Sequence, residues 1–146
     1  MRVVFDTSSL ITALRSGKGA AAEVLRLILL EKVVILMDHK IASEYRDVAL
    51  RPEHLAVARR SSESVLALIE NLEGLAEPVQ IHSKIRPLSS DPNDDMVLDV
   101  AMNGHADAVV TQNAKHFTTV ARRYGIAVLS PVDLLITLRE KSIHGD

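Results

Sequence analysis

The sequence predicts a three-layer α/β/α domain with a central, mainly parallel sheet. The first observation is that short apolar runs alternate along the chain with longer segments of helical periodicity, which is typical of folds built on a parallel sheet. The second is that some of these runs, such as AVV at residues 108–110, are unbroken by polar residues, as expected of a strand covered on both faces. A chain of 146 residues can bury one proper core, so we expect a single domain over residues 1–146.

The individual elements follow from the same periodicities. Strands are expected at residues 2–5, 33–37, 108–110 and 127–129, with a short edge strand at residues 79–81. Helices are expected at residues 9–14, 20–31, 39–50, 92–103 and 132–141, with one or two more between residues 53 and 75 and a loop passing into a short helix within residues 114–124.

Capping signals place the starts of three of these helices. Asp38 and Asp91 precede two of them, and Pro92 falls at the first helical position, where its missing N–H costs nothing. Ser130 followed by Pro131 repeats that arrangement before the last helix. Gly104 is expected to end the helix that Asp91 begins.

The composition excludes several classes of protein. The absence of cysteine excludes disulfides, thiolate catalysis and cysteine zinc sites. A net charge of -2 argues mildly against a nucleic-acid binder, and aromatic residues at 3% argue against a base-stacking platform. No stretch reaches the roughly 18 apolar residues of a membrane span, and the first strand begins within two residues of the start. We therefore expect a cytoplasmic protein without contact to a membrane.

Two acidic residues, Asp6 and Glu44, have both a structural and a functional interpretation. Asp6 directly follows the first strand; it can cap the next helix, but Thr7 or Ser8 would serve that purpose equally well. Glu44 lies beside the inward face of the helix that follows the second strand, where the alternative is a surface pairing with a nearby arginine. Ligands in open α/β sheets bind at the carboxyl ends of strands, which favours a functional role for Asp6.

The helix over residues 92–103 carries three aspartates. Asp94 and Asp95 lie in its first turn, where acids are stabilised by the helix dipole, and Asp94 alone is well explained by that. Asp95 shares a face with Leu98 and lies one turn before Asp99. A like-charged pair at this spacing costs about 0.2–0.5 kcal/mol unless a bound cation reverses the sign.

These oxygens come together if the first, second and fourth strands are neighbours. Asp6, Glu44 and Asp95 would then meet Asn113, which follows the strand at residues 108–110, at one edge of the sheet. A cluster of oxygen ligands without cysteine or paired histidines favours Mg²⁺ or Mn²⁺ over zinc. The chemistry that such a cluster most often serves is phosphodiester hydrolysis.

With these motifs the chain resembles PIN-domain ribonucleases of the kind found as VapC-like toxins in toxin–antitoxin pairs. The resemblance implies a parallel sheet with flanking helices, Mg²⁺- or Mn²⁺-dependent cleavage of an RNA substrate, a homodimer and an antitoxin protein as partner. It covers almost the whole chain and is carried by FDTSSLITAL, SEYRDVALRP, DPNDDMVLDVAMNGHADAVVTQNAKHF and VLSPVDLL.

The resemblance also assigns roles to individual residues. Asp6, Glu44 and Asp95 match the first three metal-binding acids of the family. Asn113 matches the fourth position, which is Asp or Asn across the family, and Thr111 matches a hydroxyl residue that helps to position the site.

The chain departs from the family pattern at two positions. Ser8 stands where an Asn is usual, so one hydrogen bond near the site is lost or replaced. His116 stands where another acid often follows, so we expect one firmly held metal ion and a second that arrives with the RNA. Asp94 and Asp99 are candidate auxiliary acids.

Two other functions remain open at this point. The first is a PIN-fold binding module that has lost activity and acts through a protein partner, which the features at Ser8 and Asn113 favour. The second is an aspartyl-phosphate enzyme with Asp6 as nucleophile, although such phosphatases carry a second Asp where Ser8 stands here.

Overall fold

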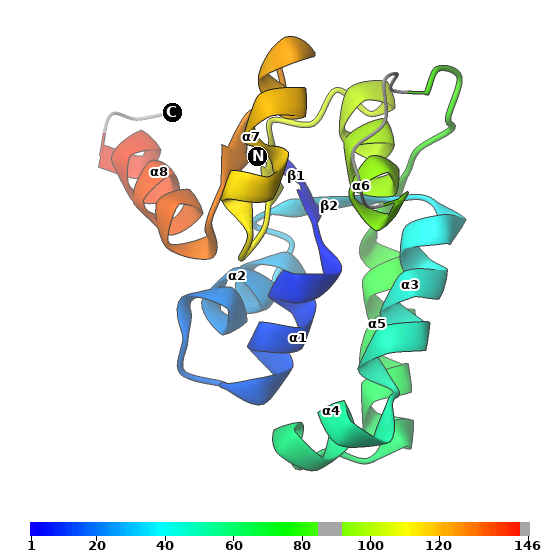
Figure 1. Ribbon diagram of the computed structural model, residues 1–146. Coiled ribbons are helices and arrows are strands. Elements are labelled where there is room, and N and C mark those ends of the chain that lie inside the picture. The colour runs from blue at the N-terminus through cyan, green and yellow to red at the C-terminus, as the bar shows by residue number, and fades with distance from the viewer. Residues whose placement is uncertain (85–91, 144–146) are drawn as a thin grey trace.

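The computed structural model of the chain describes residues 1–84 and 92–143, and within them one parallel sheet forms the middle layer. The strand order is β3-β2-β1-β4-β5, and every pair of neighbours runs parallel (Figure 1). The prediction of a three-layer α/β/α fold is therefore confirmed. The strands are β1 (Arg2–Phe5), β2 (Val34–Met37), β3 (Glu77–Pro78), β4 (Ala108–Val110) and β5 (Val128–Leu129).

Eight helices lie within the described residues and flank this sheet. Helix α6 packs against β1, β2 and β4, whereas α2 packs with α1 and α8, and α5 packs against β2 and α3. The helices are α1 (Thr7–Arg15), α2 (Ala20–Leu29), α3 (His39–Ala49), α4 (Pro52–Ala58), α5 (Ser62–Leu75), α6 (Pro92–Asn103), α7 (Ala114–Arg123) and α8 (Pro131–Ile143).

The core is centred on β1, which has β2 on one side and β4 on the other. Val3, Val4 and Phe5 are completely buried, as are Val109 and Val110 of β4. Burial on both faces is what their unbroken apolar runs predict. Because β1 and β4 are adjacent and parallel, the residues that follow them, Asp6 and Thr111, lie side by side.

Two predicted helix caps are confirmed. Asp38 Oδ1 accepts a hydrogen bond from the Ile41 N–H at 2.9 Å, and Ser130 Oγ accepts one from the Asp133 N–H at 3.1 Å. These bonds satisfy N–H groups that have no partner inside the helix. The third predicted cap, Asp91, lies outside the described residues.

The predicted edge strand at residues 79–81 is wrong, because β3 lies earlier in the chain. In the observed register, Met37 at the end of β2 is paired with Pro78. The Val79 N–H still donates to the Met37 carbonyl at 3.0 Å, but the next residue, Asp38, caps α3 and offers no further ladder. Pro78 is tolerated because β3 is an edge strand.

Helix α7 differs from the prediction of a loop that passes into a short helix. It begins directly at Ala114, with Asn113 in the cap position, and it ends at Arg123. Helix α8 continues to Ile143, two residues beyond the predicted end, which is ordinary for helix termini.

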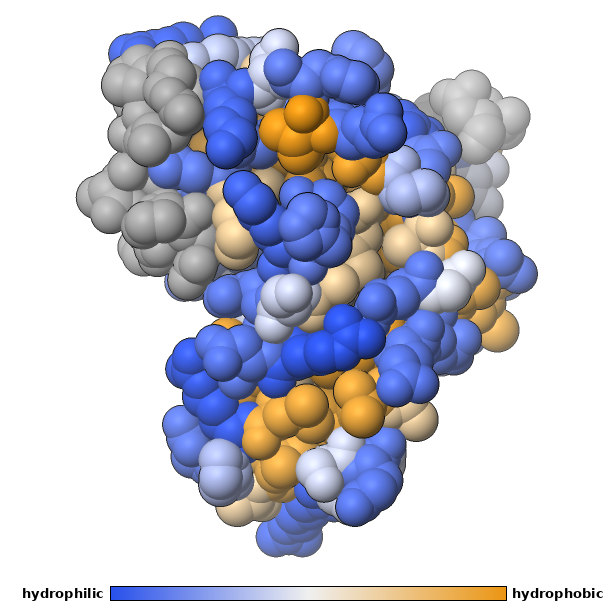
Figure 2. Space-filling view, turned by 90° about the vertical axis from the view of Figure 1, so that its right-hand side faces the viewer, coloured by the Kyte–Doolittle hydropathy of each residue, from blue (hydrophilic) through white to orange (hydrophobic). Residues whose placement is uncertain are grey.

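The surface is largely polar on the face shown in Figure 2, where hydrophobic residues gather toward the bottom, at the height of α4. Helix α4 buries none of its residues, and its Val57 is 55% exposed. Within the described part of the chain, no helix combines the length and the apolar character that a membrane crossing requires.

Candidate active site

The site is built around the carboxylate of Asp6, at the carboxyl end of the central strand. Its Oδ2 accepts a hydrogen bond from Thr111 Oγ1 at 2.5 Å, and its Oδ1 accepts one from Ser8 Oγ at 2.7 Å. The Ser9 N–H also donates to Oδ1, at 3.0 Å. Both oxygens of Asp6 are therefore held in place by neighbours on α1 and after β4.

Asp6 is also the N-cap of α1, because its bond from the Ser9 N–H satisfies an open donor of the first turn. The helix begins at Thr7, earlier than predicted, so Thr7 and Ser8 lie inside it and do not cap it. The capping interpretation of Asp6 is therefore confirmed. Capping does not use the whole carboxylate, since Oδ2 faces Thr111 on the neighbouring strand.

Burial raises the pKa of Asp6, and hydrogen bonds from Thr111, Ser8 and Ser9 lower it only in part. Its side chain is only 6% exposed, so the charged form loses most of its hydration. A cation bound beside the carboxylate would offset that loss.

Tyr45 supports the end of β1 from below the site. It is completely buried, its hydroxyl donates to the Phe5 carbonyl, and burial followed by the nearby charge of Asp6 raises the pKa of its phenol. Its inward position is evident from helical spacing, but its bond to Phe5 depends on α3 crossing the end of β1. Sequence reasoning therefore missed this supporting role.

Ser8 and Thr111 join the two strand ends into one hydrogen-bond network. Ser8 Oγ accepts a bond from the Gln112 N–H at 3.2 Å, and Thr111 Oγ1 accepts one from the Asn113 N–H at 3.0 Å. The two hydroxyls lie 3.5 Å apart. The Ser8 hydroxyl thus connects the Asp6 carboxylate to the backbone that follows β4.

Five predicted residues, Asp94 of α6 among them, line one cavity of about 170 Å³ next to this network. Asp6 and Ser8 reach it from the end of β1 and the start of α1, Glu44 from α3, and Asn113 from the end of the β4 loop. Of the four residues expected to converge, Asp6, Glu44 and Asn113 line this cavity, and the metal-binding roles predicted for the set stay predictions. Thr111 lies behind these residues, completely buried.

Of the two adjacent aspartates on α6, Asp94 lines this cavity and Asp95 is not among the lining residues. Asp94 shares a helix face with Val97, three residues on, which also lines it. Asp95 shares its face with the fully buried Leu98 and is itself 7% exposed. The role of Asp95 as third metal ligand stays a prediction, and Asp94 is the aspartate of this pair that lines the cavity.

Asp99 is not among the residues that line this cavity. It lines a second, neighbouring cavity together with Asp38 and Met96. The role of Asp99 as an auxiliary acid stays a prediction. The side chain of His116 is not among those that the structure describes.

The residues that line the site fit a divalent cation by the chemistry of their donors. Carboxylates and an amide are the oxygen ligands that Mg²⁺ and Mn²⁺ prefer, and Asp6 is a buried carboxylate without a cationic partner among its hydrogen bonds. In residues 1–84 and 92–143, however, no three acidic or histidine side chains are close enough to hold one ion together.

Comparison with known protein families decides the assignment. A family model described as the PIN domain matches residues 2–115. The chain belongs to the PIN domain family. The match runs from β1 to the start of α7 and so includes every residue of the network around Asp6. A search of curated proteins gave no match.

Membership places the chain among nuclease-like proteins, because PIN domains are generally nucleases that use divalent metal ions. This agrees with the acid-lined cavity at the carboxyl edge of the sheet, which is where ligands of open α/β folds bind.

Proposed function

We propose that this PIN-domain protein is an endoribonuclease that hydrolyses RNA phosphodiester bonds with Mg²⁺ or Mn²⁺. The observation that carries the proposal is the single cavity lined by Asp6, Glu44 and Asp94 together with Asn113. Asp6 is buried and its pKa is raised by burial, so a cation beside its carboxylate would offset the hydration that the charged form loses. Family membership supplies the reaction class, and the donor set supports the choice of ion.

In this proposal Asp6, Glu44 and Asp94 hold the ion, with Asp95 as the alternative third ligand that the sequence predicts. When bound, a divalent ion lowers the pKa of a water molecule and offsets charge on the phosphodiester. Ser8 and Thr111 keep the Asp6 carboxylate oriented, and the exposed amide of Asn113 can donate a hydrogen bond to a phosphate oxygen. Hydrolysis leaves a 5′-phosphate and a 3′-hydroxyl.

The first experiment compares RNA cleavage by the wild type, Asp94→Asn and Asp95→Asn, with Mn²⁺ and with a chelator. We expect cleavage to require the metal and Asp94→Asn to lower the rate by more than about a hundredfold, since loss of mere supporting residues at metal sites already costs about 10–100-fold. Asp95→Asn should retain most activity.

The opposite ranking of the two variants would restore Asp95 as the ligand. Activity that survives in both variants and in chelator would contradict the proposal. Products that end in a 2′,3′-cyclic phosphate would do so as well, because they require the ribose 2′-hydroxyl as nucleophile.

The second candidate is a PIN-fold binding module that acts through a protein partner. It is favoured by the lack, among the described residues, of three acids close enough to hold an ion, and by the neutral Asn113 at the fourth position. Titration with Mn²⁺ separates the two functions, because an interaction module has no need to bind the ion.

We further propose that the protein is the toxin of a toxin–antitoxin pair and forms a homodimer, on the strength of its resemblance to VapC-like toxins. The test is whether an adjacent reading frame encodes a small protein that co-purifies with this chain and inhibits its cleavage of RNA. Sedimentation of the purified chain tests the dimer. A neighbouring protein that leaves RNA cleavage unchanged would contradict the toxin–antitoxin pair, and a monomeric chain would contradict the homodimer.

A further inference from the structure

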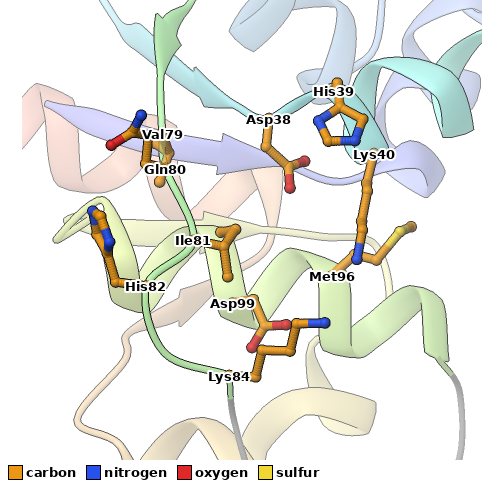
Figure 3. A pocket seen from close by; sticks show the side chains of 10 residues that line it. All are labelled: Asp38, His39, Lys40, Val79, Gln80, Ile81, His82, Lys84, Met96 and Asp99. Atoms are coloured by element: carbon orange, nitrogen blue, oxygen red, sulfur yellow. The ribbon is translucent and has the colours of Figure 1, made fainter.

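A second cavity, of about 520 Å³, lies beside the acid-lined one. It is formed between the N-terminus of α3, helix α6 and the segment of residues 79–84, here called the strap (Figure 3). Its volume lies in the range of roughly 300–1,000 Å³ that is typical of sites for small organic ligands. Nothing in the chemistry proposed above uses this cavity. Its lining residues are Asp38, His39, Lys40, Val79, Gln80, Ile81, His82, Lys84, Met96 and Asp99.

The two cavities adjoin at Met96, which lines both. Asp94 at the first cavity and Asp99 at the second are separated by little more than one turn of α6. A polymer whose backbone passes the acids can therefore place its next unit in the second cavity.

The second cavity combines cationic groups with apolar walls. Lys40 on α3 and Lys84 on the strap are both exposed at its rim, and Figure 3 shows their side chains extending toward α6 from opposite sides. Between them, Ile81 points into the space, and Val79 and Met96 complete the apolar lining.

Asp38 and Asp99 supply the carboxylates of this cavity, and Asp38 already caps α3. The cavity therefore offers contacts for a phosphate, for an apolar surface and for hydrogen-bond donors.

The strap is fixed in place by Asn103 at the end of α6. Its Oδ1 accepts hydrogen bonds from the N–H groups of His82 and Ser83, at 2.9 and 3.0 Å. Its Nδ2 donates to the carbonyls of Ser83 and Asp99, at 2.7 and 2.8 Å. One side chain thus ties the strap to the helix, so the wall of the cavity is built before any ligand arrives.

We propose that this cavity is a nucleotide subsite, which holds the unit of single-stranded RNA next to the bond that is cut. Lys40 and Lys84 contact its phosphates, Val79, Ile81 and Met96 pack against its base and sugar, and Asp99 accepts a hydrogen bond from a ribose hydroxyl or a base amino group. The inference rests on the proposed ribonuclease function and adds where its substrate binds.

The test measures binding of a fluorescent single-stranded RNA by anisotropy, in chelator so that no cleavage occurs. Lys40→Ala and Lys84→Ala are compared with Lys32→Ala, which removes an equally exposed lysine before β2, at the opposite end of the strands. We expect each cavity variant to weaken binding about three- to fivefold. Each should also lower the slope of log affinity against log salt by about 0.7, the share of one phosphate contact in a single strand.

A second comparison fills the cavity without changing its charge. Ile81→Trp should weaken RNA binding although both lysines remain, whereas Val57→Trp, on exposed α4, should leave it unchanged. Thermal melting of each variant shows that it is folded before affinity is compared.

The outcomes separate this inference from the proposed function. Binding and salt slopes that match Lys32→Ala for both cavity lysines, with normal cleavage, overturn the subsite and leave the nuclease standing. Weakened binding in the cavity variants of a chain that never cleaves RNA supports RNA binding in the cavity and removes the nuclease. A wild type that binds no RNA in chelator overturns the subsite, and RNA cleavage with Mn²⁺ then decides the nuclease separately.

Discussion

At the scale of single residues, Asp6 performs a structural and a chemical task with one carboxylate. It caps α1 through Ser9 and faces Thr111 with its other oxygen. Burial raises its pKa, so ionised Asp6 is held in an environment that favours the neutral form. Such a loss of folding stability is typical of functional sites, where residues are selected for reactivity and not for stability.

We therefore expect Asp6→Asn to stabilise the metal-free protein near neutral pH while it abolishes metal-dependent cleavage. The raised pKa means that the folded state binds more protons than the unfolded state between the unfolded pKa, near 3.8, and the higher folded one. Stability falls as pH rises through that window, and the loss persists above it. The asparagine carries no charge, so the variant avoids this loss. We expect its free energy of unfolding to be about 0.5–2 kcal/mol higher, the usual gain when a residue that destabilises a functional site is replaced.

Urea unfolding of both proteins across the acidic range measures this gain in unfolding free energy. The wild type should lose stability relative to Asp6→Asn as pH increases from about 4. A variant less stable than the wild type at every pH would show that the cap depends on the charge of Asp6.

Thr111→Val is expected to lower the free energy of unfolding, the opposite of the effect expected for Asp6→Asn. It removes the hydroxyl that donates to Asp6 and accepts from the Asn113 N–H, and it leaves a buried carboxylate oxygen without that partner. Loss of about 1–3 kcal/mol of unfolding free energy is expected, the usual cost of an unsatisfied buried group. Thr111→Ser keeps the hydroxyl and is the matched control; equal losses in both variants would mean that the methyl group, not the hydrogen bond, matters.

At the scale of elements, the end of α6 is constrained by close packing. A Cβ added at Gly104 would lie 2.8 Å from Cγ2 of Val79, 2.9 Å from the Val100 carbonyl oxygen and 3.0 Å from Cδ1 of Leu36. The glycine is therefore required by the approach of α6 to the strap and β2. The same approach lets Asn103 reach the strap backbone.

Gly104→Ala should destabilise the fold by about 1–3 kcal/mol, as overpacking of a core does. Gly74→Ala is the control, because Gly74 lies inside α5 with nothing within 4 Å of an added Cβ. There alanine should stabilise by up to about 1 kcal/mol through helix propensity. The free energies of unfolding of the two variants provide the comparison, and shifts of the same sign would contradict the packing argument.

At the scale of the whole molecule, the site is assembled from segments that are distant in sequence. Asp6, Glu44 and Asp94 come from the end of β1, from α3 and from α6, and they meet because β2, β1 and β4 are neighbours. An ion bound among them would tie these segments together. Metal binding should therefore be visible as stability of the entire fold.

Mn²⁺ is expected to raise the melting temperature of the wild type, with a stabilisation of about 2.7 kcal/mol when the ion is at 100 times its dissociation constant. Glu44→Gln should remove this shift, because a ligand is lost. Glu70→Gln, on an exposed position of α5, is the control and should keep it. A wild type that does not respond to Mn²⁺ would favour the binding module.

Much of this architecture is determined locally and so could be predicted. The apolar runs define β1 and β4, Asp38 and Ser130 cap their helices through bonds to the third residue on, and Pro131 starts α8. Asp6 and Asn113 are recognisable because they stand just after strands, whereas Glu44 and Asp94 lie on helices next to apolar positions. These features depend on neighbours within a turn of helix or a few residues of strand, which the sequence alone specifies.

Only the tertiary structure determines the direction in which the side chains of α6 point and the residues over which neighbouring strands pair. Whether Asp94 or Asp95 faces the cavity turns on the rotation of α6 against the sheet, because adjacent residues on a helix point in different directions. Asp99 faces the other cavity for the same reason. The edge strand lies at Glu77–Pro78 and not at residues 79–81, because β2 ends at Met37 and a strand exists only where a partner offers hydrogen bonds. Local periodicity contains neither the rotation of a helix nor the reach of a neighbouring strand, so only the folded chain determines them.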